Sequence, residues 1–125
     1  MSSLTQTFKV EKEDCISDLA DYLPAMLGTY VLVKWMEIVS AKNINTQIDK
    51  EKYITFGQRV DIEHLQMVKL GEEVEVILTI TEKAKREISF EIEAFNVEGE
   101  LVARATHKRV LMPLKVVEKI FKGEK

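Results

Sequence analysis

The 125-residue sequence has one cysteine, Cys15, and only two prolines. One cysteine excludes a disulfide within the chain, so we expect a reducing compartment, the cytoplasm. Residues 1–5 have neither the basic start nor the apolar stretch of a signal peptide. No apolar run approaches the roughly 20 residues that cross a bilayer. We therefore expect a cytoplasmic protein with no membrane partner.

The sequence also has little excess of either charge. Its net charge is −3, and the acidic and basic residues are interspersed along the chain. A protein that binds a phosphate backbone needs a continuous basic surface, so nucleic acid is not an expected partner. With 46% hydrophobic and 31% charged residues, the composition is that of a folded globular protein, and the length predicts a single domain over residues 1–125.

The first half of the chain predicts one short strand and two helices. Residues 5–11 alternate in character, with Phe8 and Val10 on one face, which is typical of a strand. Residues 13–22 have the spacing of a short helix. Residues 29–43 predict the longest helix, and its side chains are apolar on nearly all sides, which indicates a buried helix. Thr29 is expected to be its N-cap.

The second half predicts four strands. Apolar side chains of one parity alternate with polar ones, as expected for an antiparallel sheet with one covered face. His64 shares its parity with Phe56, Val60 and Ile62. A segment after Pro113 is amphipathic and is expected to pack back onto the body. The predicted fold class is α+β, with a five-stranded antiparallel sheet wrapped around one long central helix.

Four polar residues are candidates for chemistry. His64 is predicted on the face towards the helix, where an imidazole could transfer protons, although it could equally be a core histidine bonded to a backbone carbonyl. Glu37 lies in the most apolar part of the long helix, and its alternative role is an ion pair with Lys34. Thr29 could be only a helix cap. For His107, beside Lys108, we expect a surface or interface position.

Several chemistries lack support in the sequence. Two distant histidines and one cysteine give no metal-ligand spacing, and neither a glycine-rich phosphate loop nor a Gly-x-Ser-x-Gly motif is present. Cys15 follows Glu13 and Asp14, which disfavour a thiolate, so we interpret it as structural. No metal and no cofactor are expected.

The residues resemble a known family, the hotdog-fold thioesterases, and within it the fluoroacetyl-CoA thioesterase branch. The similarity spans about residues 5–112. The matching segments are Gly28-Thr29, Glu37 eight residues later, Phe56 to Leu65, Leu70 to Val74, Gly99 to Ala103, and Thr106 to Arg109.

The resemblance implies a hotdog fold, a homodimer with active sites at the subunit interface, and an acyl-CoA thioester as substrate, with coenzyme A as part of that substrate. It implies Thr29, Glu37 and His64 as the catalytic trio. Gly57 and Arg109 become substrate-binding candidates, with Lys108 as an alternative to Arg109. A tetramer is left open. The chain departs from the family at Tyr30, where relatives commonly have proline, so fluoroacetyl specificity is not inferred.

Helix geometry bears on how such a site is built. Eight residues on one helix separate Thr29 and Glu37 by roughly 12 Å, too far for both to contact one carbonyl. Either Thr29 is displaced at the start of the helix, or two subunits combine their residues, and both alternatives favour a dimer as the working unit. The expected reaction is hydrolysis of a short or modified acyl-CoA to a free acid and coenzyme A. The alternatives are a non-catalytic acyl-CoA or small-ligand binding module, a hydratase of the same fold, and a purely structural dimer.

Overall fold

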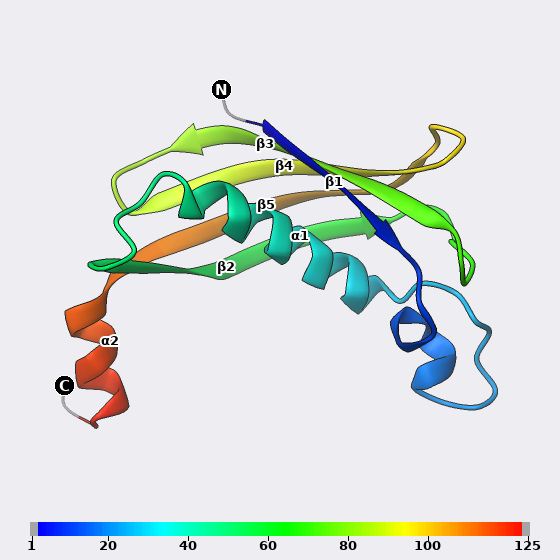
Figure 1. Ribbon diagram of the computed structural model, residues 1–125, viewed down its shortest axis with the longest axis horizontal. Helices are drawn as coiled ribbons and strands as arrows, with labels where there is room; N and C mark the ends of the chain where they lie inside the picture. The colour runs from blue at the N-terminus through cyan, green and yellow to red at the C-terminus, as the bar shows by residue number, and fades with distance from the viewer. Residues whose placement is uncertain (1–2, 124–125) are drawn as a thin grey trace.

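A five-stranded antiparallel sheet curves around one long helix in the computed structural model, which describes residues 3–123 (Figure 1). The sheet order is β1-β3-β4-β5-β2, so that β1 and β2 are its edges. The predicted fold class is confirmed. The strands are β1 (Ser3–Lys9), β2 (Tyr53–His64), β3 (Glu73–Lys83), β4 (Glu87–Asn96) and β5 (Leu101–Pro113), and the α-helices are α1 (Thr29–Asn45) and α2 (Leu114–Phe121).

The core lies between α1 and the inner face of the sheet. Successive side chains of a strand point to opposite faces of the sheet. Alternate residues of β3 and β4 are therefore buried in this core, and their polar neighbours point to the outer face. Trp35 of α1 stacks on Phe8 of β1 with ring centroids 4.7 Å apart. Within residues 3–123, neither α-helix is long and apolar enough to cross a membrane.

The helix α1 is not covered on every side. Tyr30, Lys34 and Glu37 form an exposed stripe along it, and Val33 and Ile38 beside them are only half-buried. An apolar helix flanked by an open stripe of this kind indicates a face that a single chain leaves uncovered.

A bulge in β2 corrects the predicted parity of that strand. Gly57 pairs with Arg109 and Arg59 pairs with Lys108, so Gln58 is an extra residue. An extra residue reverses which side chains face inwards. Phe56 was therefore predicted on the wrong face: it is 39% exposed, and Gly57 faces α1 instead.

Two further local predictions were wrong. The expected helix over residues 13–22 is a pair of short 3-10 turns, η1 (Lys12–Asp14) and η2 (Ile16–Asp18). The C-terminal segment does form a helix, α2, but none of its residues is buried. In Figure 1 it extends away from the sheet rather than folding back on it.

Candidate active site

Thr29 and His64 meet at one end of the molecule. The Thr29 hydroxyl and His64 Nδ1 are 2.9 Å apart and form a hydrogen bond. The chain beside each residue enforces this contact, because the Leu27 N–H donates to the Val68 carbonyl at 2.8 Å and the Leu70 N–H donates to the Ala25 carbonyl at 3.2 Å. These bonds tie the segment before Thr29 to the loop after His64.

The second nitrogen of His64 has no such partner. Its Nε2 atom is buried and has no hydrogen-bond partner within residues 3–123. The expected alternative, a core histidine bonded to a backbone carbonyl, is not what the structure shows, because the bond it forms is to a hydroxyl. An unpaired buried nitrogen calls for an explanation, and a functional site is one.

The N-cap of α1 is Gly28 and not Thr29, which corrects another prediction. Gly28 takes the extended conformation of a cap, and its carbonyl accepts hydrogen bonds from the N–H groups of Val31 and Leu32. Thr29 is the first helical residue. Its hydroxyl is therefore not used to cap the helix and bonds to His64 instead.

Glu37 lies in a different group of residues, two helical turns further along α1. A side chain added to Gly57 would overlap the Glu37 carboxylate and would lie 2.9 Å from His107 Cε1. A glycine is thus required for the carboxylate to lie against the strand. Glu37 pairs with Arg109 at 3.9 Å, and Lys34, its expected alternative partner, forms no ion pair within residues 3–123.

Arg109 anchors this second group from β5. Its guanidinium is almost fully buried, and it donates to the Thr55 hydroxyl at 3.3 Å and to the Thr55 carbonyl at 3.2 Å. Burial lowers the pKa of Arg109, and the Glu37 carboxylate partly offsets this effect. The expected substrate-binding candidates Gly57 and Arg109 therefore lie beside the same carboxylate.

The surface or interface position expected for His107 was wrong, since only 2% of the residue is exposed. Its Nδ1–H donates to the Arg59 carbonyl of the bulge at 2.9 Å, which leaves Nε2 buried without a partner within the described residues. Burial is the largest cause that lowers the pKa of His107. Its parity with Ala103 and Ala105 is the signal in the sequence that would have predicted a buried position.

The five candidates thus form two half-sites in one chain. The first is the Thr29–His64 pair, and the second is the group of Glu37, Gly57 and Arg109. Thr29 and Glu37 lie on the same helix, α1, and are roughly 12 Å apart along its axis. A single chain does not bring the whole predicted trio around one reacting atom.

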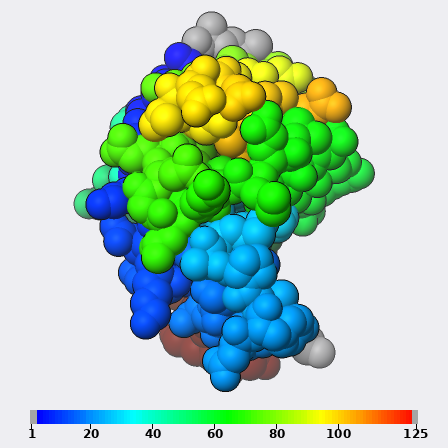
Figure 2. Space-filling view, turned by 90° about the vertical axis from the view of Figure 1, so that its right-hand side faces the viewer, coloured from blue at the N-terminus to red at the C-terminus, as the bar shows by residue number. Residues whose placement is uncertain are grey.

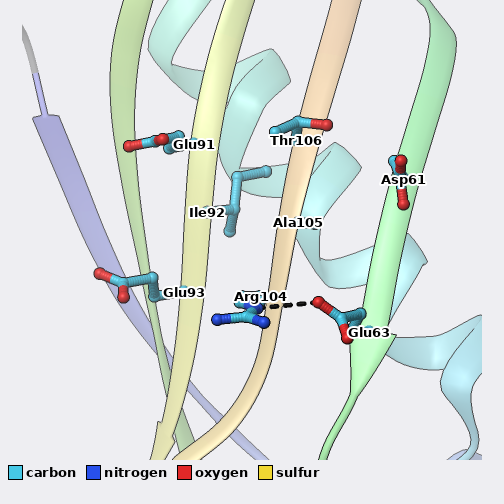
Figure 3. A pocket seen from close by; sticks show the side chains of 8 residues that line it. All are labelled: Asp61, Glu63, Glu91, Ile92, Glu93, Arg104, Ala105 and Thr106. Carbon is cyan, nitrogen blue, oxygen red and sulfur yellow. Dashed lines mark hydrogen bonds and ion pairs between the residues drawn. The ribbon is translucent and has the colours of Figure 1, made fainter.

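A hollow of about 350 Å³ lies elsewhere, on the outer face of the sheet (Figure 3). Carboxylates surround it, and Arg104 pairs with Glu63 across it at 2.9 Å. None of the predicted site residues lines this hollow. Within residues 3–123, no three His, Cys, Asp or Glu side chains are grouped to hold a metal ion.

Cys15 lies apart from both half-sites and is buried. Burial raises the pKa of its thiol, and the carboxylates of Asp14, Asp18 and Glu13 raise the pKa further. A thiol of this kind is a poor nucleophile, in agreement with the structural role expected from the sequence.

A curved sheet around one helix is the fold of the hotdog thioesterase superfamily, and solved structures of that class match this chain. A hypothetical protein of Thermus thermophilus, described as a thioesterase superfamily member, has a TM-score of 0.87 and 23% identity, and the match covers 97% of this chain and 88% of that one. A hot-dog-like protein from Thermanaerovibrio acidaminovorans has a TM-score of 0.88 and 17% identity, with coverages of 98% and 89%.

The fluoroacetyl-CoA thioesterase FlK also matches, with a TM-score of 0.87, 16% identity, and coverages of 99% and 95%. At the level of families, residues 10–115 match the model described as "FlK: Fluoroacetyl-CoA-specific thioesterase". The chain belongs to this family. A comparison with curated protein sequences found no match.

Proposed function

We propose that this protein is an acyl-CoA thioesterase that hydrolyses a short or modified acyl-CoA to a free acid and coenzyme A. The observation that carries the proposal is the Thr29–His64 hydrogen bond, in which the imidazole keeps a buried, unpaired Nε2. The family match supports the thioester substrate class. A variant of FlK has been solved in complex with acetyl-CoA, which supports coenzyme A esters as the ligand class.

The working unit in this proposal is a homodimer. Strand β2 is a free edge with unpaired backbone groups, and such an edge can pair with a second copy. A two-fold axis halfway between Gly57 and His64 would place each Gly57 opposite the partner's His64. The Glu37 half-site of one subunit would then face the Thr29–His64 half-site of the other. The exposed stripe of α1 supports this arrangement, because it would be covered.

The proposed chemistry uses the two half-sites together. Glu37 either attacks the thioester carbonyl carbon itself, forming a mixed anhydride that water later cleaves to the free acid and the restored carboxylate, or takes a proton from a water molecule that attacks the carbon. The carbon–sulfur bond then breaks, and the partner's His64 supplies a proton to the leaving sulfur. Thr29 holds the imidazole through the 2.9 Å bond. The N–H of Gly57 or the Arg109 guanidinium stabilises the developing oxyanion.

A thiol-release assay over a panel of acyl-CoA esters tests this proposal. We expect Thr29→Ala, Glu37→Gln and His64→Ala each to lower kcat/KM by roughly 10²- to 10⁴-fold, the usual contribution of a positioned acid or base. The matched control is Glu91→Gln, the same change on the outer face of the sheet (Figure 3), which should keep the wild-type rate. Wild-type rates in all three variants would refute the site.

The same assay separates the main alternative. A non-catalytic binding module would bind a coenzyme A ester saturably, with no thiol release by the wild-type protein and no change in binding in Glu37→Gln. Loss of conjugated absorbance from an enoyl-CoA would instead indicate a hydratase.

A further inference from the structure

Within residues 3–123, much of the apolar face of α2 is uncovered, although Leu114 and Val117 at its start are half-buried. Val116, Ile120 and Phe121 are exposed, and Phe121 is 85% exposed. The helix begins directly after Pro113, which pairs with Tyr53 at the start of β2. Figure 1 shows α2 extending past the β2 edge of the sheet, away from the other strands.

Residues 11–28 extend past the same edge at the other end of β2. Figure 2 looks at this end and shows the blue segment standing out below the strands, with α2 in red behind it. This segment also exposes apolar side chains, Leu19 and Tyr22, and Tyr22 is 86% exposed. The helix α2 and residues 11–28 therefore project past the free β2 edge at its opposite ends.

The two projections have opposite charges. Residues 11–28 contain five acidic residues and one lysine, whereas residues 114–122 contain three lysines and one glutamate. Exposed apolar side chains on both, with complementary charge around them, are the features of two surfaces that fit each other. Within one chain they cannot meet, because the 12 residues of β2 separate them by roughly 35 Å.

We propose that α2 of one subunit docks on residues 11–28 of a second copy of this chain. This rests on the proposed dimer. Antiparallel pairing of two β2 edges brings the Tyr53 end of each strand to the partner's His64 end, so α2 comes to the partner's residues 11–28. Phe121 and Ile120 then pack against the region of Leu19 and Tyr22.

The docking has a consequence for the active site. Residues 25–27 hold Thr29 against His64 through the bonds to Val68 and Leu70. A partner helix on residues 11–28 would cover this segment and limit its motion. The two subunits would thus complete each other's site both through β2 and through α2, with α2 acting as a positioning element.

Cysteine cross-linking tests the docking in the full-length chain. In the double variant Tyr22→Cys/Phe121→Cys, oxidised glutathione should produce a covalent dimer on a non-reducing gel, because a disulfide requires Cα atoms within about 7 Å. The matched control is Tyr22→Cys/Val97→Cys. Val97 is also exposed, but it lies in the turn between β4 and β5, away from the β2 edge. Cross-linking of the first variant no greater than that of the control would overturn the proposal.

A second measurement uses charge. Lys119→Glu should weaken the dimer by about two- to fivefold at low salt, the range of exposed ion pairs, whereas Lys42→Glu, whose ammonium bonds to Gln6 at the opposite edge of the sheet, should not. Equal dissociation constants for these two variants would count against the docking. A dimer that hydrolyses thioesters but does not cross-link would overturn the docking alone. An inactive protein that still cross-links would refute the proposed function and leave the docking supported.

Discussion

A mixture of two inactive variants should recover activity if the half-sites combine across two subunits. The variants are Glu37→Gln, which damages one half-site, and His64→Ala, which damages the other. In a dimer containing one chain of each kind, the intact Glu37 of one chain faces the intact Thr29–His64 pair of the other. The second site of that dimer contains both substitutions. Each mixed dimer therefore has one working site.

The size of the recovery follows from random assembly. When equal amounts are dissociated and allowed to reassociate, half of the dimers are mixed, and each has one of its two sites intact. The expected thiol-release rate is about a quarter of the wild-type rate at the same total protein concentration. If each chain held a complete site, every chain in the mixture would remain damaged, and the rate would stay at the level of the single variants.

The control mixture combines Thr29→Ala with His64→Ala. These residues are hydrogen-bonded within one chain, so both substitutions damage the same half-site and no mixed dimer has an intact one. We expect no recovery from this mixture. Two results would refute the division of the site between subunits. One is equal recovery of activity in the control and in the first mixture. The other is no recovery in the first mixture although size measurements show that mixed dimers form.

Three further predictions concern the Glu37 half-site and His107 beside it. Gly57→Ala should lower kcat/KM by roughly 10- to 100-fold in the thiol-release assay, because the new methyl group would displace the Glu37 carboxylate, and it should also lower the melting temperature, because the methyl group would crowd the buried His107 ring. Since burial lowers the pKa of His107 from its usual 6.5, the unfolded state binds this proton more readily than the folded state as pH decreases below 6.5. The free energy of unfolding should therefore fall by up to about 1.4 kcal/mol per pH unit as pH decreases there, and denaturant titrations of His107→Gln should lack this component. Arg109→Lys should lose about 1–3 kcal/mol of unfolding free energy, since a lysine cannot make both bonds to Thr55.

Regular patterning made most of the fold predictable. Alternation placed Val74 to Ile80 on the inner face of β3, and the apolar run from Val31 onwards placed α1 in the core. The β2 bulge could not be predicted in the same way. Phe56, Val60 and Ile62 fit an unbroken alternation, so this alternation gives no sign of the extra residue. An apolar side chain at position 56 outweighed the one indication of irregularity, the adjacent glycine.

The sequence predicted candidate site residues but not how the fold arranges them. The pairing of Thr29 with His64 depends on backbone bonds between residues 25–27 and 68–70, which are far apart in the sequence and have no motif. His107 was misjudged because its neighbours Lys108 and Arg109 are both basic, although Arg109 is itself buried. The neighbouring charges indicated that His107 lies on the surface. In β5, however, side chains alternate between the two faces of the sheet, and His107 is on the buried face.

The distance between Glu37 and Arg109 gives a physical reason for a site at an edge of the sheet. A tight ion pair between a guanidinium and a carboxylate has contacts of about 2.7–2.9 Å and fixes the carboxylate. The observed 3.9 Å neutralises charge but leaves the half-exposed Glu37 free to reorient. In a single chain that carboxylate remains in water, where its interactions are screened. Covering the β2 edge with a second subunit would remove the water and strengthen each electrostatic contact to a substrate, so assembly itself would create the environment that the reaction needs.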